Sequence, residues 1–384
     1  MATADVIVVG GGVIGGSIAY HLLARDPRLK VILLEKEAEV GTGATSKATG
    51  GVRHQFSTET NIRLTQLSYP YFADAERVLG RSVDFIPHGY LFVTTEPGTF
   101  EQLKKNVALQ RRRGVRSRLI DPREMKAMLS QLVVDDLLGG TFCPDDGSAD
   151  PYGLLQGFLA LARERGLRVL TSEPVVSVSR EGERVVGVET PRDRYRAPVV
   201  VNAAGPYADR VGALVGVAIP SKPYRRQVLV TDPLPDFPEV FPLIVDLDTG
   251  WYVHRQGKSA VLMGGTDKDE HPGYDTTVDW EAFDLVFKAA GKRVPPLADA
   301  KVMRAYAGVR DLTPDYHGIL CAARDPQGFY IACGFSGHGF MHSPAIGLLM
   351  AELILDGRAT SMDIGGLSLE RFKAGTVSTE ANMF

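Results

Sequence analysis

The chain has few cysteines, little net charge and no long apolar run, and each absence excludes a class of protein. Its 384 residues include three cysteines, Cys143, Cys321 and Cys333. These are too few and too scattered for a disulfide framework or a metal site, so we predict reduced thiols in a cytoplasmic protein. A net charge of −3 gives no reason to expect a nucleic-acid partner. No stretch reaches the ~20 apolar residues of a membrane span, and the first residues lack the basic segment of a signal peptide.

The first thirty-five residues carry a nucleotide-binding pattern. An apolar run at 5–9 is followed by Gly10-Gly11-Gly12-Val13-Ile14-Gly15, then by helical spacing, and a second apolar run ends at Glu35. Such glycines permit a tight turn and close approach of the backbone to a pyrophosphate, and the helix start offers N–H groups to it. Glu35 lies where a carboxylate accepts hydrogen bonds from a ribose. The segment is predicted to bind ADP as part of FAD or NAD; a plain strand–helix–strand turn is the alternative.

Small-residue loops at 41–53, 202–205 and 334–340 are separated by strand-rich stretches. Helical spacing covers 58–79, where Pro70 is expected to kink or split the helix, and 344–355, whereas 84–95 alternates like a pair of strands. The distribution predicts an α/β protein of two domains. A discontinuous Rossmann-like nucleotide domain would comprise 1–83, 145–221 and 305–384, and an inserted antiparallel-sheet substrate domain would comprise 84–144 and 222–304.

Five stretches resemble the D-amino-acid-oxidase-like flavoproteins, the group that includes glycine oxidase, sarcosine oxidase and proline dehydrogenase subunits. They are VIVVGGGVIGGSIAYHL, GATSKATGGVRHQF, VVVNAAGPYADRVG, AGVRDLTPD and GFSGHGFMHSPAIG. The resemblance covers nearly the whole chain and implies FAD rather than NAD. Sarcosine oxidase attaches its FAD through a cysteine aligned with 307–309, where this chain has none, so the resemblance implies non-covalent FAD.

The resemblance also implies which residues hold the cofactor. The loop at 43–51 would run beside the flavin, a strand start near 175 would reach the adenine, and the turn at 337–339 would face the flavin pyrimidine. For Ser46 and Lys47 a solvated surface loop is the alternative. The expected cofactor residues are Gly10, Gly12, Val13, Ile14, Gly15, Glu35, Lys36, Ala44, Thr45, Ser46, Lys47, Gly50, Gly51, Val175, Ala203, Gly205, Gly308, Gly337, His338, Gly339, Phe340 and Met341.

Two arginines are candidates for gripping a substrate carboxylate, which a planar guanidinium does in two-point fashion. Arg310 matches the carboxylate-binding arginine of glycine oxidase, and Arg53 matches the substrate arginine of sarcosine oxidase. Tyr252 matches a tyrosine of the substrate pocket, and His54 and His338 are weaker candidates. The alternatives are salt-bridged or surface arginines, a core tyrosine and packed histidines.

The resemblance thus implies an FAD-dependent oxidoreductase that oxidises the C–N bond of a small amino or N-alkyl amino acid of the sarcosine, glycine or proline type. Hydride would pass to flavin N5, and the electron acceptor would be O2 or a redox partner, in a protein that could form an oligomer. Leu262 or Met263 stands where sarcosine oxidase has its oxygen-activating lysine, which predicts slow reaction with O2. A non-catalytic flavoprotein subunit or assembly factor is the alternative function.

Overall fold

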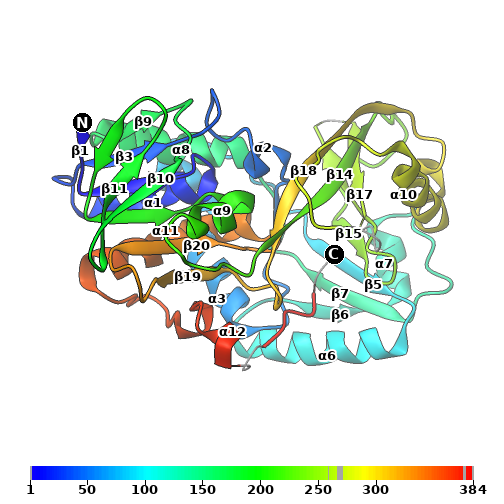
Figure 1. The fold of residues 1–384 in the computed structure, drawn as a ribbon. Coiled ribbons are helices and arrows are strands. Elements are labelled where there is room, and N and C mark those ends of the chain that lie inside the picture. The colour runs from blue at the N-terminus through cyan, green and yellow to red at the C-terminus, as the bar shows by residue number, and fades with distance from the viewer. Residues whose placement is uncertain (1, 258, 266–270, 375–377, 383–384) are drawn as a thin grey trace.

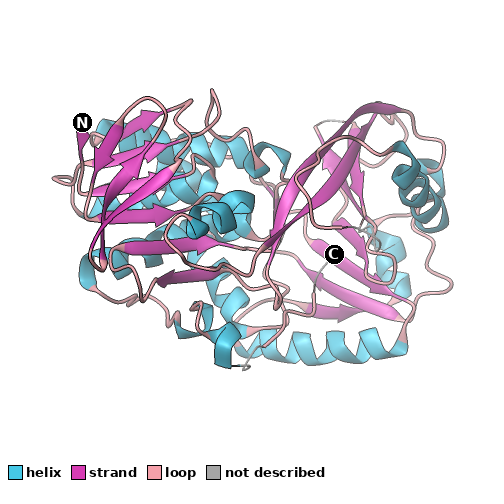
Figure 2. Ribbon diagram, in the orientation of Figure 1, coloured by secondary structure: helices cyan, strands magenta, loops and turns pink. Residues whose placement is uncertain are grey.

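The computed structural model describes residues 2–257, 259–265, 271–374 and 378–382. Two halves, each built on its own large sheet, lie side by side and are joined by the long strands β14 (Lys222–Thr231) and β18 (Val302–Leu312) (Figure 1). Helices cover the outer sides of both sheets (Figure 2). Among the described residues, no helix is both long and apolar enough to cross a membrane.

A six-stranded sheet of order β19-β20-β13-β2-β3-β9 is the centre of the first half. Five strands run parallel, and only the edge strand β19 is antiparallel to its neighbour. Continuous β-branched and leucine runs form these strands because both faces are buried. The bounds are β2 Val6–Val9, β3 Val31–Leu34, β9 Arg168–Leu170, β13 Val199–Asn202, β19 Ile319–Ala322 and β20 Phe329–Cys333.

The two faces of this sheet have different covers. Val6 and Val8 pack with a layer of helices, whereas Ile7 and Val9 pack with a smaller sheet of order β1-β12-β11-β10. The main helices of the first face are α1 Val13–Arg25, α3 Glu59–Ser68, α8 Pro151–Glu164 and α11 Gly339–Asp356. On the second face lie β1 Ala2–Thr3, β10 Ser177–Glu181, β11 Arg184–Glu189, β12 Arg194–Arg196, η1 Gly205–Tyr207 and α9 Ala208–Ala213.

The second half is an eight-stranded sheet of order β18-β14-β17-β16-β15-β5-β7-β6, antiparallel except where β15 pairs with β5. Its outer face packs against α7 and α10, and its inner face, with Tyr90, Tyr252 and Leu262, turns toward the first half. The remaining bounds are β5 Tyr90–Thr94, β6 Arg118–Ile120, β7 Gly139–Cys143, β15 Leu243–Asp246, β16 Tyr252–Gln256, β17 Ala260–Gly264, α6 Pro97–Arg112, α7 Pro122–Met128 and α10 Trp280–Arg293.

The remaining helices and strands are short, and they lie between the elements named above or after the last of them. They are α2 Ala44–Lys47, β4 Gly51–Val52, α4 Pro70–Ala73, α5 Ala75–Leu79, β8 Gly147–Ser148, η2 Pro295–Leu297, η3 Gly365–Leu367 and α12 Arg371–Ala374.

One local prediction from the sequence is confirmed and two are wrong in detail. The helical segment expected over 58–79 is split at Pro70, as one of the two expectations for that proline had it, and it is divided again at Asp74, which leaves helical geometry before α5. The strand pair expected over 84–95 is the single strand β5, preceded by an isolated bridge from Ile86 to Ser148. The last long helix begins at Gly339 and continues through Pro344. The domain boundaries stay a prediction, and β18 itself crosses residue 305.

Candidate functional site

The predicted phosphate-binding turn lies between β2 and α1. Gly10 has a φ of 115°, and a Cβ there would collide with the carbonyl oxygen of Ala203, just after β13. A Cβ on Gly15 would collide with the Gly10 carbonyl, so glycine alone lets α1 lie against the end of β2. The Val13 N–H donates to Thr45 Oγ1 at 3.0 Å, which ties the start of α1 to α2. The turn combines small residues with a helix N-terminus, as a bound pyrophosphate requires.

The acid at the end of β3 is held beside the same turn. Glu35 Oε2 accepts a hydrogen bond from Gly11 N at 2.7 Å, and Oε1 accepts one from Glu37 N at 2.9 Å. The Glu35 carbonyl accepts from Glu173 N at 2.8 Å, which brings the chain leading to Val175 to this end of the sheet. These contacts assemble the ribose and adenine end of the predicted nucleotide site. Lys36 points outward, with Nζ 4.5 Å from the centroid of the Tyr207 ring.

The loop at 43–51 reaches from the nucleotide turn to the second half. Lys47 contacts β18, where a Cβ on Gly308 would lie 2.6 Å from Lys47 Cβ. A Cβ on Gly51 would collide with the Tyr90 hydroxyl of β5. Ser46 is exposed, and its hydroxyl donates to the Thr42 carbonyl at 3.2 Å. The loop therefore spans the junction of the two halves, but Ser46 turns away from it.

The turn before α11 lies against the first candidate arginine. Gly337 has a φ of 87°, and a Cβ there would lie 2.7 Å from Arg310 Nε. His338 is the N-cap residue of α11, and the following residues Phe340 and Met341 are buried. The guanidinium of Arg310 thus reaches from the inner face of the eight-stranded sheet to the N-terminus of α11.

Two tyrosines accompany Arg310 on that face. Burial raises the pKa of Tyr252 to about 12, and burial also raises the pKa of Tyr90. The charge of Arg310 opposes the pKa shift of Tyr252, whereas the pKa shift of Tyr90 is opposed first by Arg53 and then by Arg310. Both phenols are therefore neutral at physiological pH, and they offer hydroxyl groups in an otherwise apolar and aromatic surface.

The second candidate arginine, Arg53, is 2% exposed and is held by several protein groups. Its Nη1 donates to the Gln55 carbonyl at 2.6 Å, and its Nη2 donates to the Asn382 carbonyl at 2.7 Å. The same Nη2 lies 3.1 Å from His338 Nε2. Since a guanidinium only donates, Nε2 is the acceptor and the ring is neutral. Burial lowers the pKa of His338 well below its ordinary value, and the charge of Arg53 acts in the same direction.

His54 is held by a buried carboxylate, that of Asp146. Asp146 Oδ1 lies 2.9 Å from His54 Nδ1 and also accepts from His54 N at 2.7 Å. Asp146 Oδ2 accepts from Gln55 Nε2 at 3.3 Å. With Cys143, this pair places three potential metal-ligating atoms within 4.8 Å, in the part of the chain that the structure describes. The hydrogen bonds already made by Asp146 identify it as the anchor of the 53–55 loop.

Comparison with known proteins decides the family. The family model described as "FAD dependent oxidoreductase" matches residues 5–353. The chain belongs to this family of FAD-dependent oxidoreductases.

Among its relatives, human mitochondrial sarcosine dehydrogenase is 30% identical over 97% of this chain but only 42% of that protein. A Xenopus laevis protein named FAD-dependent oxidoreductase domain-containing protein 1 is 29% identical over 99% of this chain and 85% of its own length. Thus the chain spans less than half of the first of these relatives and most of the second.

Solved structures show the same fold for this oxidoreductase. L-proline dehydrogenase from P. horikoshii superposes with a TM-score of 0.91 at 29% identity, covering 98% of this chain and 99% of that one. Glycine oxidase from Geobacillus kaustophilus gives a TM-score of 0.86 at 24% identity, covering 97% and 99%. The two-domain α/β fold and the FAD cofactor expected from the sequence are therefore confirmed.

The residues of the oxidoreductase fit FAD. The glycine turn leaves no room for a Cβ at Gly10 or Gly15, and Glu35 lies beside the turn, where the ribose of an ADP group is expected. Thr45 contacts the start of α1 next to that turn, and Lys47 contacts Gly308 of β18 in the second sheet, so the loop between them connects the two regions. Bound there, FAD supplies a two-electron acceptor, and the chain supplies its position and surroundings.

Sequence reasoning missed four residues of this region: Tyr90, Asp146, Glu380 and Asn382. Tyr90 lies in a strand that looks like ordinary core, and Asp146 follows a turn without a motif. Glu380 and Asn382 belong to a terminal segment whose composition gives no signal, and only the folded chain brings them to Arg53.

Proposed function

We propose that this oxidoreductase oxidises the C–N bond of a small amino or N-alkyl amino acid of the sarcosine, glycine or proline type. The observation that carries the proposal is the position of Arg310, whose guanidinium lies at the turn before α11 and beside Tyr252 and Tyr90. A carboxylate bound there would be gripped in two-point fashion, because the guanidinium presents a planar fork. The names of sarcosine dehydrogenase and L-proline dehydrogenase among the similar proteins support this substrate class.

The chain orients the substrate and excludes water rather than supplying a strong base. With its carboxylate at Arg310, a small substrate would place its α-carbon or N-alkyl carbon over the aromatic inner face and toward the α11 turn. FAD held there would supply a hydride acceptor for that carbon; loss of the hydride from the neutral amine would give an iminium ion, which water would hydrolyse. His338 is neutral and accepts from Arg53, so it contributes position rather than a proton. The final electron acceptor is O2 or a redox partner.

The test is anaerobic reduction of the flavin by a panel of amino and imino acids. We expect at least one small amino acid to bleach the oxidised flavin absorbance of the wild type. Arg310→Ala is expected to bleach much more slowly with that compound, while Arg304→Ala, an exposed arginine of the same strand, serves as the matched control. If dithionite reduces the flavin but no amino or imino acid does, the proposal is wrong and a non-catalytic flavoprotein subunit is favoured.

A further inference from the structure

The segment Ser378–Asn382 enters the molecule between its two halves (Figure 1). Two of its side chains are buried: Glu380 is 1% exposed and Asn382 is 4% exposed. Asn382 donates through Nδ2 to the Gln55 carbonyl at 3.0 Å, and its own carbonyl accepts from Arg53 at 2.7 Å. This segment, called the tail below, is therefore packed into the region of the candidate substrate site.

The carboxylate of Glu380 is fixed by a set of donors at the start of α3. Oε1 accepts from Ser57 N at 2.8 Å and from Ser57 Oγ at 2.6 Å. Oε2 accepts from Thr58 Oγ1 at 2.8 Å and from Asn61 Nδ2 at 3.0 Å. Asn382 N also donates to Oε1, at 3.1 Å. With this many donors, the ionised form is stabilised despite its burial.

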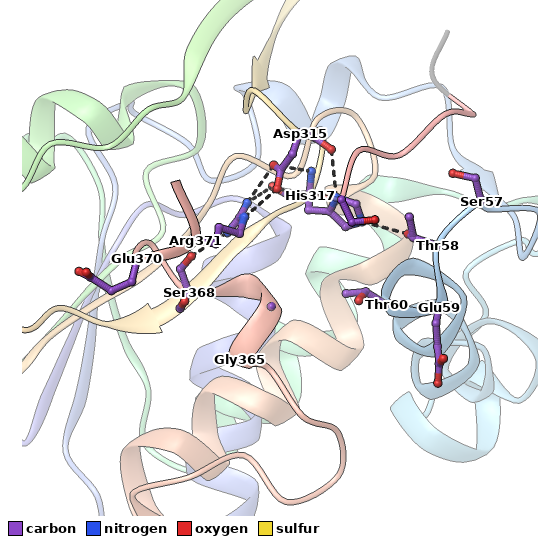
Figure 3. Close-up of a pocket in the computed structure, with 12 residues that line it drawn as sticks. Ser57, Thr58, Glu59, Thr60, Asp315, His317, Gly365, Ser368, Glu370 and Arg371 are labelled. Carbon is purple, nitrogen blue, oxygen red and sulfur yellow. Dashed lines mark hydrogen bonds and ion pairs between the residues drawn. The ribbon is translucent and has the colours of Figure 1, made fainter. Parts of the chain in front are cut away.

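The tail is also held by Asp315, whose carbonyl accepts from Glu380 N at 3.1 Å. The contacts around Asp315 are drawn in Figure 3. Arg371 donates to both oxygens of Asp315, at 2.7 and 3.0 Å, and His317 Nε2 lies 2.9 Å from Thr58 Oγ1. These residues line a cavity of about 620 Å³ that also borders Ser57. The Thr58 hydroxyl that holds Glu380 is thus itself contacted by His317, whose carbonyl accepts from Arg371 of the buried ion pair at 2.9 Å.

Glu380 and Arg53 compensate each other's charge. Burial lowers the pKa of Arg53, and the charge of Glu380 is the main influence opposing that shift. Burial alone would raise the pKa of Glu380, but the hydrogen bonds from Ser57 and the charge of Arg53 bring it below its ordinary value. A buried guanidinium needs such a partner, because an uncompensated buried charge is strongly destabilising.

Arg310 has different surroundings. The neighbouring carboxylate of Asp311 is turned to the far side of β18, where its Oδ2 accepts from Gly334 N at 2.6 Å. After burial, the largest influence on the pKa of Arg310 is the neutral phenol of Tyr252, followed by the Asp311 carboxylate and Tyr90. The two arginines of the site therefore differ, since the tail acts on Arg53 through the Asn382 carbonyl and the charge of Glu380.

We infer that the tail is the built-in counter-ion of Arg53 and restricts the site to substrates with a single carboxylate, bound at Arg310. A second carboxylate directed at Arg53 would have to displace the Asn382 carbonyl and would lie close to the negative charge of Glu380. Glu380 is thus a specificity-determining residue that acts through Arg53. The inference rests on the proposed function, because it assumes that carboxylates bind beside the flavin.

The test compares acetate and malonate, as a monocarboxylate and a dicarboxylate, on the FAD-loaded protein at constant ionic strength. Binding is measured by perturbation of the flavin absorption spectrum, which does not depend on turnover. For the wild type we expect malonate to bind no more tightly than acetate. For Glu380→Gln we expect the ratio of acetate Kd to malonate Kd to rise at least about tenfold, because the negative charge of Glu380 no longer opposes a second carboxylate at Arg53.

Glu370→Gln is the matched control, because Glu370 borders the same cavity but pairs with Arg324 and Lys373. Its Kd ratio is expected to equal that of the wild type. A Glu380→Gln protein with normal flavin content and an unchanged ratio would overturn the inference. Should that variant not fold, the wild type still decides, since malonate binding tenfold more tightly than acetate would also overturn it.

The proposed function fails in a different way. If neither acetate nor malonate perturbs the flavin of the wild type, and no amino acid reduces it, then carboxylates do not bind beside the flavin. That result rejects the amino-acid site itself, and the inference with it. Acetate binding with an unchanged ratio in Glu380→Gln rejects the inference alone.

Discussion

Leu262 and Met263 are neighbours in β17 but face opposite sides of the eight-stranded sheet. Leu262 packs on the inner face with Tyr90 and Tyr252, whereas Met263 packs on the outer face with Trp251. The sequence left open which of the two stands in place of an oxygen-activating lysine. The alternation of the strand assigns that place to Leu262.

Leu262→Lys is therefore expected to speed reoxidation of the reduced flavin by O2, by about tenfold or more. A cation on the inner face would stabilise the superoxide formed when the first electron passes to O2. Substrate-reduced protein is mixed with air-saturated buffer and followed by flavin absorbance, with Leu262→Met as the uncharged control. Wild-type reoxidation at or above the turnover rate would show a true oxidase and contradict the expectation of slow oxygen reaction.

Arg310→Ala is expected to lower kcat/KM for the best substrate by roughly thirty- to a thousandfold. Loss of a charge-assisted bond to a desolvated carboxylate costs about 2–4 kcal/mol. Lysine is expected to restore the activity only in part, because it lacks the planar fork. Flavin content, measured by absorbance per protein, is expected to stay normal. Full kcat/KM in the alanine variant would make Arg310 a structural residue, and loss of FAD would place it at the cofactor.

The flavin is expected to be bound without a covalent link. Covalent attachment through cysteine needs a reactive thiolate. Cys143, Cys321 and Cys333 are all buried, and burial raises the pKa of each thiol. Acid precipitation should release yellow FAD into the supernatant. Colour that remained in the pellet would indicate a bond to the protein, with a histidine as the first candidate.

Asp311 is expected to give the protein a specific pH dependence of stability. Burial raises the pKa of Asp311 to about 6, from 3.8. The folded state therefore holds this proton more tightly than the unfolded state. The resulting stabilisation is fully present below pH 3.8 and is lost as the pH rises through about 6.

Asp311→Asn removes this titration and keeps an acceptor for Gly334 N. The Tm of the variant minus the Tm of the wild type is expected to rise between pH 4 and pH 7, because the wild type loses stability over this range. The rise is on the order of 2–4 °C for each kcal/mol of unfolding free energy that the wild type loses. Asp299→Asn, at an exposed aspartate, serves as the control. A difference that does not change with pH would show that Asp311 is ionised throughout this range.

The parts that the sequence predicted well are those governed by local pattern. The strand, turn and helix around Gly10 follow from periodicity and the placement of the glycines, and all three are present. The strand β15 was missed because Leu243–Asp246 is short and follows a proline-rich stretch. Strand β19 was missed because its edge position leaves only a short apolar run.

The site is harder to predict because it depends on long-range contacts. Arg53 and Arg310 look equivalent in the sequence, as two arginines in glycine-rich motifs. They differ only because Glu380 and Asn382, more than three hundred residues from Arg53, fold back onto it. No periodicity or spacing records such a contact, so the sequence could propose both arginines but could not distinguish their roles.

The strand order of the six-stranded sheet has a consequence for biosynthesis. Strand β13 lies between β2 and β20, and β20 is made of residues Phe329–Cys333. A nascent chain that ends before residue 329 therefore exposes one edge of β13, and helix α1 lacks its partner α11. Open edges of this kind pair readily with other chains. The complete site also needs α11 and the tail, so the site can form only after residue 382 has been synthesised, and the open edge is exposed until β20 pairs with β13.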